Sequence, residues 1–204
     1  MRRGLAVLAL LSGAAAPAAA QDAALTVALQ NGVPRVQATA LLANGKFVDL
    51  MRSGFPLRLH YRLELWRIRS GWLDEHMSEA SWDAVAHYDP LADDFVLART
   101  GGTARRYAQV DALARALQTP YKVTLAPKGA GRFYYFGRLQ VSTLNETDLE
   151  EVEQWLKGDV SPAVSGRGNL GGALVRGAQR ILVRIAGLPR LALEARSETF
   201  SRGN

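Results

Sequence analysis

The feature that most constrains the fold is an uninterrupted alternation of apolar and polar side chains between residues 55 and 65. The apolar positions are Phe55, Leu57, Leu59, Tyr61, Leu63 and Leu65, and the polar positions are Arg58, His60, Arg62 and Glu64. Because successive side chains of a strand point to opposite faces, this pattern predicts a long strand with a core face and a solvent face. The apolar phase then moves to Trp66 and Ile68, which predicts a bulge or bend after Leu65.

Turn residues divide much of the remaining chain into further short strands. Asn31-Gly32 separates two extended patterns, at 24–29 and 33–40, which is typical of a hairpin. Asp89-Pro90 and Gly101-Gly102 separate the predicted strands 82–88, 94–100 and 104–107, and two more are predicted at 121–125 and 133–141. This succession of short strands joined by turns predicts an antiparallel meander.

Three segments show the spacing of short helices instead. Apolar residues recur at helical intervals in 46–52 and 110–117, and both segments end near a proline. A third helix is predicted at 148–157, where Thr147 and Glu150 have the spacing of a capping box. The predicted fold class is therefore mostly β (α+β): an antiparallel β-sandwich-like domain with short inserted helices.

The N-terminus has the pattern of a secretory signal peptide over residues 1–20. Arg2 and Arg3 precede a short apolar core at 5–11, and small residues follow it. The predicted cleavage site comprises Ala18, Ala20 and Gln21. The alternative is an uncleaved membrane anchor over 4–20, but its strongly apolar part is shorter than the roughly 20 residues that a spanning helix needs.

The chain contains no cysteine, so it can carry neither a lipoprotein anchor nor a disulfide. An exported domain of this kind must be held together by its core alone. The formal net charge is +6 with Arg2 and Arg3 included, which suits an anionic membrane or another acidic surface. Because exported proteins seldom meet nucleic acid, we expect no nucleic-acid partner.

The composition changes after residue 158. Residues 159–169 are rich in Gly, Ser and Pro and predict a linker, and residues 170–204 predict an amphipathic helix followed by a tail. The residues expected to contact a membrane or a partner are Arg176, Arg180 and Arg184 on the basic stripe and Ile181 and Ile185 on the apolar face. Such a helix either packs on its own domain or a partner, or lies at an anionic membrane surface. The tail from Leu191 to Phe200 is expected to be disordered.

Six short segments carry a family resemblance: Ser53-Gly54-Phe55-Pro56-Leu57-Arg58, Trp72-Leu73-Asp74, Tyr88-Asp89-Pro90-Leu91, Tyr121-Lys122-Val123, Tyr134-Tyr135 and Gln154-Trp155-Leu156. With these segments the chain resembles an exported bacterial family called domain of unknown function 4390, over about residues 24–158. The resemblance implies export to the envelope and a shared fold for the predicted domain 21–158. It implies no activity, because none of the segments is a catalytic signature.

Motifs of the common enzyme classes are missing from the sequence. It has no Gly-x-Ser-x-Gly elbow and no His-Glu-x-x-His helix, and the separations of His60, His76 and His87 do not resemble a compact zinc motif. The glycine-rich run at 166–171 has the glycine spacing of a dinucleotide-binding fingerprint, but no strand is predicted before it, as that fingerprint requires. We therefore predict no catalytic residues, no metal and no cofactor.

The sequence thus predicts a non-enzymatic accessory or binding module in the periplasm of a bacterium of Gram-negative type. Its predicted binding residues are Arg58, His60 and Arg62, on the polar side of the long strand, and its predicted partner is an envelope protein. One alternative is a peripheral membrane protein held by the basic C-terminal helix. The other is a hydrolase whose site is assembled from distant residues.

Overall fold

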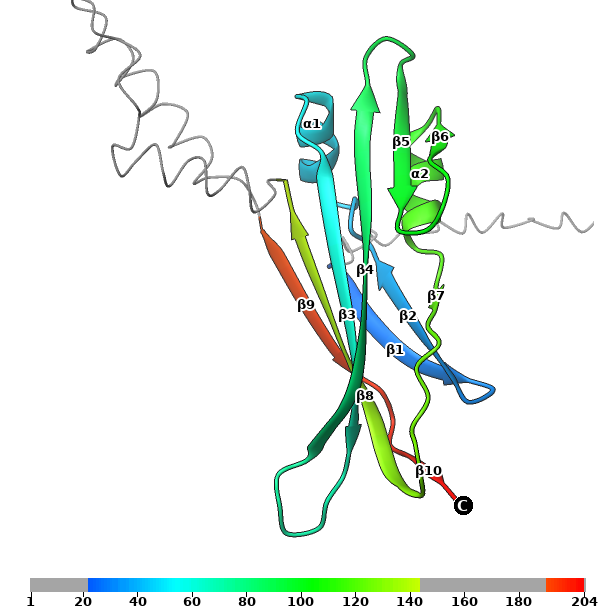
Figure 1. The fold of residues 1–204 in the computed structure, drawn as a ribbon. Helices are drawn as coiled ribbons and strands as arrows, with labels where there is room; N and C mark the ends of the chain where they lie inside the picture. Colours follow the sequence, from blue (N-terminus) through cyan, green and yellow to red (C-terminus); the bar gives the residue numbers. More distant parts are fainter. Residues whose placement is uncertain (1–21, 144–189, 204) are drawn as a thin grey trace, which may run out of the picture.

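The computed structural model describes residues 22–143 and 190–203, which form two antiparallel sheets and two short helices (Figure 1). The first half of the chain forms β1 (Ala24–Gln30), β2 (Val33–Thr39), α1 (Lys46–Arg52), β3 (Leu57–Arg67) and β4 (Glu75–Asp89). The second half forms β5 (Asp94–Arg99), β6 (Arg105–Tyr107), α2 (Val110–Leu117), β7 (Tyr121–Lys122), β8 (Gly131–Ser142), β9 (Leu191–Arg196) and β10 (Phe200–Arg202).

The larger sheet has the strand order β10-β8-β3-β4-β5-β6, and β9 pairs with β8 beside β10. The smaller sheet has the order β1-β2-β7 and lies against the larger one, with β1 packed on β8 and β9. Strands β3, β4 and β8 are long and strongly twisted, so the large sheet curls around the small one (Figure 1). The architecture of the described residues is therefore mostly antiparallel β, as predicted.

Local sequence signals explain several elements directly. Asn31 and Gly32 both have positive φ, 53° and 74°, as a two-residue hairpin turn between β1 and β2 requires. The helices α1 and α2 occupy the predicted ranges 46–52 and 110–117. The pairing of β3 with β4 shifts register between Leu65 and Trp66, where the apolar phase of the sequence predicts a bulge.

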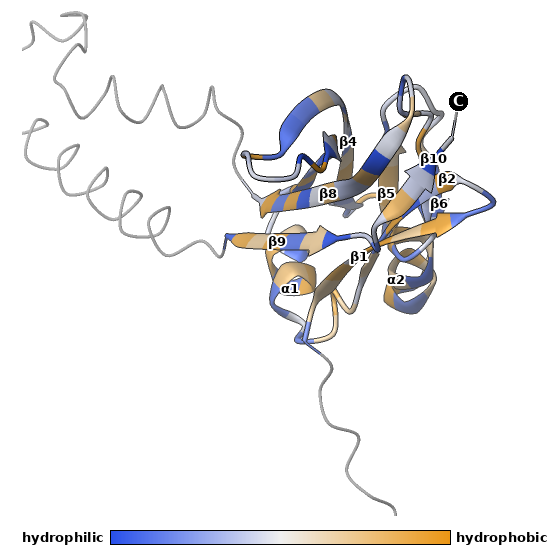
Figure 2. Cartoon of the chain, turned by 90° about the horizontal axis from the view of Figure 1, so that it is seen from below, coloured by the Kyte–Doolittle hydropathy of each residue, from blue (hydrophilic) through white to orange (hydrophobic). Residues whose placement is uncertain are grey.

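The core lies between the two sheets and receives the apolar face of β3. Leu57, Leu59, Leu63 and Leu65 are almost completely buried there. In Figure 2 the strands β8 and β9 alternate between hydrophobic and hydrophilic residues along their length, as expected for strands with one covered face.

Two predicted elements differ from the structure. Strand β4 begins at Glu75 rather than at residue 82, because the long strand β3 offers an unpaired edge through the whole segment 75–81. The predicted strand 121–125 is paired only at Tyr121 and Lys122, after which the chain turns away from β2 apart from one hydrogen bond at Val123.

The predicted disorder of the tail from Leu191 to Phe200 is wrong. Residues 191–196 pair with Phe136–Val141 of β8, and residues 200–202 pair with Gly131–Phe133. Ser197 joins the two strands: its backbone N–H donates to the carbonyl of Tyr135, and its hydroxyl accepts from the Tyr135 N–H. The tail pairs with the edge of β8 that would otherwise be unpaired, and this pairing explains why the tail forms strands.

Four predicted segments lie outside the described residues: the signal peptide predicted at 1–20, the helix predicted at 148–157, the linker predicted at 159–169 and the amphipathic helix predicted from residue 170. None of the helices in the described segments has the length and apolar character that crossing a bilayer requires.

Candidate functional site

The predicted binding residues lie on the side of the large sheet that faces away from the core. We call this side the outer face. Cross-strand pairing of β9, β8, β3 and β4 places the following residues together on it: Glu194 and Arg196; Tyr134, Phe136, Arg138 and Gln140; Arg58, His60, Arg62, Glu64 and Trp66; and His76, Glu79 and Asp83. Its residues come from four strands, and between two of these, β8 and β9, lie residues 144–189, which the structure does not describe.

Glu64 is the centre of the outer face, and its side chain is only 5% exposed. Arg62 Nε lies 3.0 Å from Glu64 Oε1, and Arg138 Nη1 lies 3.8 Å from the same oxygen. The indole Nε1 of Trp66 donates to Glu64 Oε2 at 2.9 Å. Arg138 also pairs with Glu194 at 3.1 Å, so the carboxylate of Glu64 links β3 to β8 and, through Arg138, to β9.

Stacked pairs of cationic and aromatic side chains surround this carboxylate. The guanidinium of Arg138 lies 5.0 Å from the ring centroid of Phe136, that of Arg196 lies 3.6 Å from Tyr134, and Trp66 meets the His76 ring edge-on at 5.2 Å. Such contacts hold long side chains in one orientation and stabilise them against the sheet. The outer face is thus ordered, even though about half of the Arg138 side chain remains in solvent.

The three predicted residues differ in their surroundings. His60 Nδ1 lies 2.7 Å from Asp83 Oδ1, and Arg62 is paired with Glu64 and Glu79. Arg58 has no ion pair with any carboxylate of the described residues. The charge of Arg58 is therefore available to an external group, whereas Arg62 is paired with two carboxylates and His60 is engaged by Asp83.

The Glu64 contacts lead to a stability prediction. We expect Glu64→Ala to lower the free energy of unfolding by about 1–2 kcal/mol, because it leaves the indole N–H of Trp66 without its acceptor and removes one of the two carboxylates paired with Arg62 and with Arg138. The effect stays below the range for fully buried ion pairs, since Arg62 and Arg138 are about half exposed and water replaces part of the loss.

The matched control is Glu194→Ala, which removes a carboxylate that pairs with the same Arg138 but is 59% exposed. We expect its effect in urea denaturation to stay within about 0.5 kcal/mol. Equal effects of the two variants would contradict the structural role assigned to Glu64.

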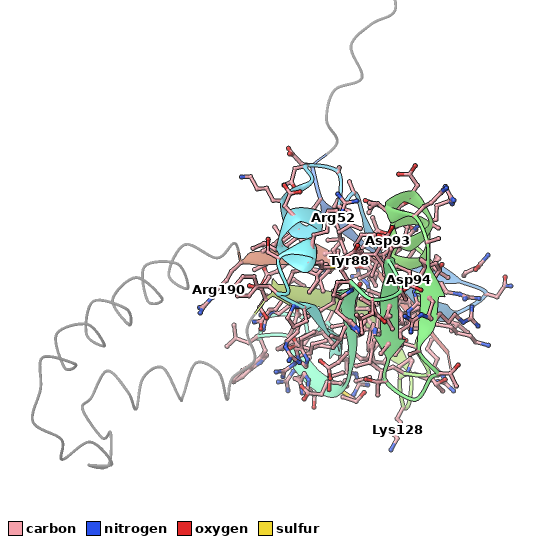
Figure 3. All side chains as sticks on the ribbon, turned by 90° about the horizontal axis from the view of Figure 1, so that it is seen from above. Arg52, Tyr88, Asp93, Asp94, Lys128 and Arg190 are labelled. Atoms are coloured by element: carbon pink, nitrogen blue, oxygen red, sulfur yellow. The ribbon has the colours of Figure 1, made fainter. Side chains whose placement is uncertain are left out.

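A second candidate site is a hollow of about 470 Å³ at the end of the fold where α1 stops. It lies between Arg52, the turn that joins β4 to β5, and the beginning of α2 at residues 108–111. Arg52, Tyr88 and Asp93 gather there in Figure 3. The Tyr88 hydroxyl donates to Asp93 Oδ1 at 2.6 Å, and Phe95 forms the floor, 5.2 Å from the Tyr88 ring.

The chemistry of this hollow is that of a small polar binding site. Its hydrogen bond to Asp93 raises the pKa of Tyr88 and keeps the phenol protonated at neutral pH. The lining contains a cation, two carboxylates and two aromatic rings, and one of the carboxylates, Asp93, already accepts a hydrogen bond from Tyr88. The predicted hydrolase alternative gains no support from this hollow and stays a prediction.

Arg106 fixes the turn beside the hollow by pairing with Asp89 and, at 2.7 Å, with Asp94. The hydrogen bond from Arg106, aided by the backbone N–H groups of Leu91 and Ala92, holds the pKa of Asp89 below its ordinary value. The pair therefore stabilises the fold at neutral pH, and this contribution is lost as the pH falls through the lowered pKa of Asp89.

We expect Arg106→Gln to raise the pKa of Asp89 toward its ordinary value, because the first cause of the shift is removed. A carboxyl NMR titration measures this directly. Arg105→Gln is the control, since Arg105 is exposed and has no ion pair within the described residues. An unchanged pKa of Asp89 in the Arg106→Gln protein would contradict the assignment.

The remaining predicted contact residues, Arg176, Arg180, Arg184, Ile181 and Ile185, lie outside the described residues, as do Ala18, Ala20 and Gln21. Within the described ranges, no group of three or more His, Asp or Glu side chains is arranged to hold a metal ion.

Sequence reasoning missed the part of the outer face that β8 and β9 supply. The alternation of Tyr135, Leu139 and Val141 with Arg138 and Gln140 signals a polar side of β8. Nothing in a single sequence states that this side continues the polar side of β3, because pairing between distant strands leaves no local pattern.

Comparison with known proteins gives one result. A family model described as "Domain of unknown function (DUF4390)" matches residues 18–155, which is more than half of the chain. Neither the curated proteins nor the solved structures contain a significant match. The match ends before β9 and β10, so the edge strands that complete the outer face lie outside the matched region.

Proposed function

The chain belongs to the DUF4390 family, a domain of unknown function, and from this premise we propose that it is an exported, non-enzymatic module that binds an envelope protein on its outer face. The observation that carries the proposal is the ordered set of arginine and aromatic side chains on this face of the sheet. Arginine, tyrosine and tryptophan are the residues most enriched at the energetic centres of protein interfaces.

The charges of the outer face indicate what such a partner offers. Glu64, Glu79 and Glu194 are already engaged by arginine side chains of the same face, and Asp83 is engaged by His60. Arg58 and Arg196, by contrast, have no carboxylate partner among the described residues, and Arg196 is held over Tyr134 instead. The complementary surface therefore carries carboxylates opposite these two arginines and apolar groups opposite Phe136 and Trp66.

Preorganisation supports binding rather than simple solvation. The ion pairs and ring contacts hold the side chains of Arg62, Arg138 and Arg196 in place before any partner arrives. A partner then immobilises fewer free side chains, and each one avoided saves about 0.5–1.5 kcal/mol of ordering. A sheet face that contacts only water does not require its arginine side chains to be held in one orientation.

Site-specific photocrosslinking in the cell envelope tests the proposal. A crosslinking residue is placed at exposed outer-face positions, Gln140 or Ala192, and at exposed positions elsewhere, Thr26 on β1 or Lys122 on β7. We expect one defined protein adduct from the outer-face positions and none from the others. Absence of an adduct at the outer face, or the same adducts from all four positions, would overturn the proposal.

A further inference from the structure

The connection between β3 and β4 ends in a projecting tip that exposes two adjacent large apolar side chains. Trp72 is 82% exposed and Leu73 is 88% exposed. Figure 1 shows this loop extending beyond the neighbouring strands at the end of the sheet opposite α1. Among the described residues only Leu91, in the turn between β4 and β5, is a large apolar side chain of comparable exposure.

Contacts at the base of the loop hold the tip away from the sheet. Arg69 Nε donates to the carbonyl oxygen of Leu73 at 3.4 Å and lies 3.8 Å from Glu75. Burial and the nearby carboxylate of Asp74 raise the pKa of Tyr134, so the base of the loop lies beside β8. Two apolar side chains are thus presented to solvent by a braced loop, although burying them against the molecule would be favourable.

Cationic side chains surround the same end of the sheet. Arg67 donates to the carbonyl of Ala130, and Arg202 donates to the carbonyl of Pro127. Arg132 lies beside Ile68, whose N–H donates to its carbonyl, and Lys128 projects away from the fold in Figure 3. No carboxylate of the described residues forms an ion pair with any of these four cations, so their charge is uncompensated.

We propose that this end of the molecule is a membrane contact: Trp72 and Leu73 enter the interface of an anionic lipid surface, and the surrounding cations bind its phosphate groups. Tryptophan partitions to the boundary between headgroups and acyl chains, where its ring is covered and its N–H stays hydrated. Basic side chains within a Debye length of an anionic leaflet add to the attraction.

The geometry favours lipid over a protein at this end. An apolar pair on a protruding apex, with uncompensated cations at the same end of the sheet, fits a fluid anionic surface that closes around it. The outer face has the opposite character, since its charges are nearly balanced and its Phe136 and Tyr134 rings are covered by arginine side chains. The membrane contact is independent of the proposed protein-binding function and uses different residues.

The absence of cysteine from the sequence allows a direct test on the full chain. An environment-sensitive fluorophore is attached to Leu73→Cys, and to Leu91→Cys as the matched control. Leu91 is 98% exposed but lies among Asp89, Asp93 and Asp94 at the other end of the sheet. Because each label reports its own position, vesicle binding through another segment does not produce the expected signal at the tip.

With vesicles of phosphatidylglycerol and phosphatidylcholine, we expect the label at position 73 to brighten severalfold and to be quenched by a lipid-borne nitroxide. The label at position 91 should remain in water, and vesicles of phosphatidylcholine alone should give a much weaker response at position 73. A water-exposed label at position 73 with anionic vesicles would overturn the proposal, as would equal responses at the two positions. A label at position 73 that only an envelope protein shields would assign the tip to a protein partner and also overturn it.

The cations are tested separately. Lys128→Gln with Arg132→Gln should weaken binding of the anionic vesicles roughly 30-fold, about fivefold for each cation. The same charge change in Lys46→Gln with Lys122→Gln, both exposed and remote from the tip, should have little effect. Equal losses in the two double variants would show an effect of net charge alone and contradict a localised contact.

Discussion

Replacing Tyr61 with alanine is expected to lower the free energy of unfolding by about 3–5 kcal/mol, a large fraction of the stability of a domain of this size. Tyr61 is completely buried at the centre of β3. Its ring stacks on Trp82 of β4 with centroids 5.3 Å apart, and lies 4.9 Å from the ring of Tyr121 in the small sheet. Alanine removes the contact between the two sheets and leaves a cavity that the strands cannot close.

Tyr61→Phe separates the contribution of the ring to stability from that of the hydroxyl, because it keeps the ring and removes the hydroxyl. The hydroxyl is buried, and no group of the described residues forms a hydrogen bond with it. Burial also raises the pKa of Tyr61 well above its usual value, so the phenol is neutral at neutral pH. We therefore expect phenylalanine to be neutral or to stabilise the protein by about 1 kcal/mol.

Urea denaturation of the two Tyr61 variants measures both effects. A large loss of stability in Tyr61→Phe would contradict the account, because it would require a hydrogen bond from the hydroxyl. A loss below about 1 kcal/mol in Tyr61→Ala would show that the stacked rings do not join the sheets.

The second large effect is expected at Gly137 of β8. A Cβ atom at this position would lie 2.6 Å from Val27 Cγ2 of β1, far closer than two carbon atoms approach. Gly137 therefore allows β1 to pack directly on the large sheet. We expect Gly137→Ala to destabilise the protein by about 1–3 kcal/mol through overpacking.

A double-mutant cycle identifies the cause. In the Val27→Ala background the clashing methyl group is absent, so Gly137→Ala should cost at least about 1 kcal/mol less than in the native sequence. Gly102→Ala is the control, because its Cβ would meet only ordinary contacts, the nearest at 3.5 Å. Simple additivity of the Val27 and Gly137 variants would contradict the close approach of β1 to β8.

Local patterns predicted the elements whose causes are local. The alternation around Tyr61 predicted β3 and its core face, the phase change after Leu65 predicted the bulge, and Asn31-Gly32 predicted the first hairpin. These features depend on neighbouring residues, on strand periodicity and on the φ angles that a turn requires. The family resemblance is confirmed by the match over residues 18–155.

Features that depend on distant pairing were missed. The segment from Leu191 to Arg202 is short and carries charges, so it resembles a disordered tail until the edge of β8 is seen beside it. The same applies to Glu64, which the strand pattern placed in solvent. Arg138 from β8 and the indole of Trp66 cover its carboxylate, and neither contact follows from spacing along β3.

The placement of Arg58 was predicted from the sequence, but its lack of an ion-pair partner was not. Alternation put Arg58, His60 and Arg62 on one side of β3, and the structure places them together on the outer face. The structure then shows which of these side chains is free to bind a partner: His60 and Arg62 are paired within the face, and Arg58 is not. Arg196 of β9 is a second cation without a carboxylate partner among the described residues.

The most direct test of the outer face as a binding surface compares two variants with the same change in net charge. One is Arg58→Glu with Arg196→Glu on the outer face, and the other is Lys46→Glu with Lys122→Glu, both exposed and away from it. Each is titrated with the envelope protein that crosslinks at Gln140. The account predicts that the outer-face variant raises Kd at least about 30-fold, an interface hot-spot effect of about 2 kcal/mol or more, while the control changes it less than about threefold. Equal changes in the two variants, or an unchanged Kd in the outer-face variant, would contradict it.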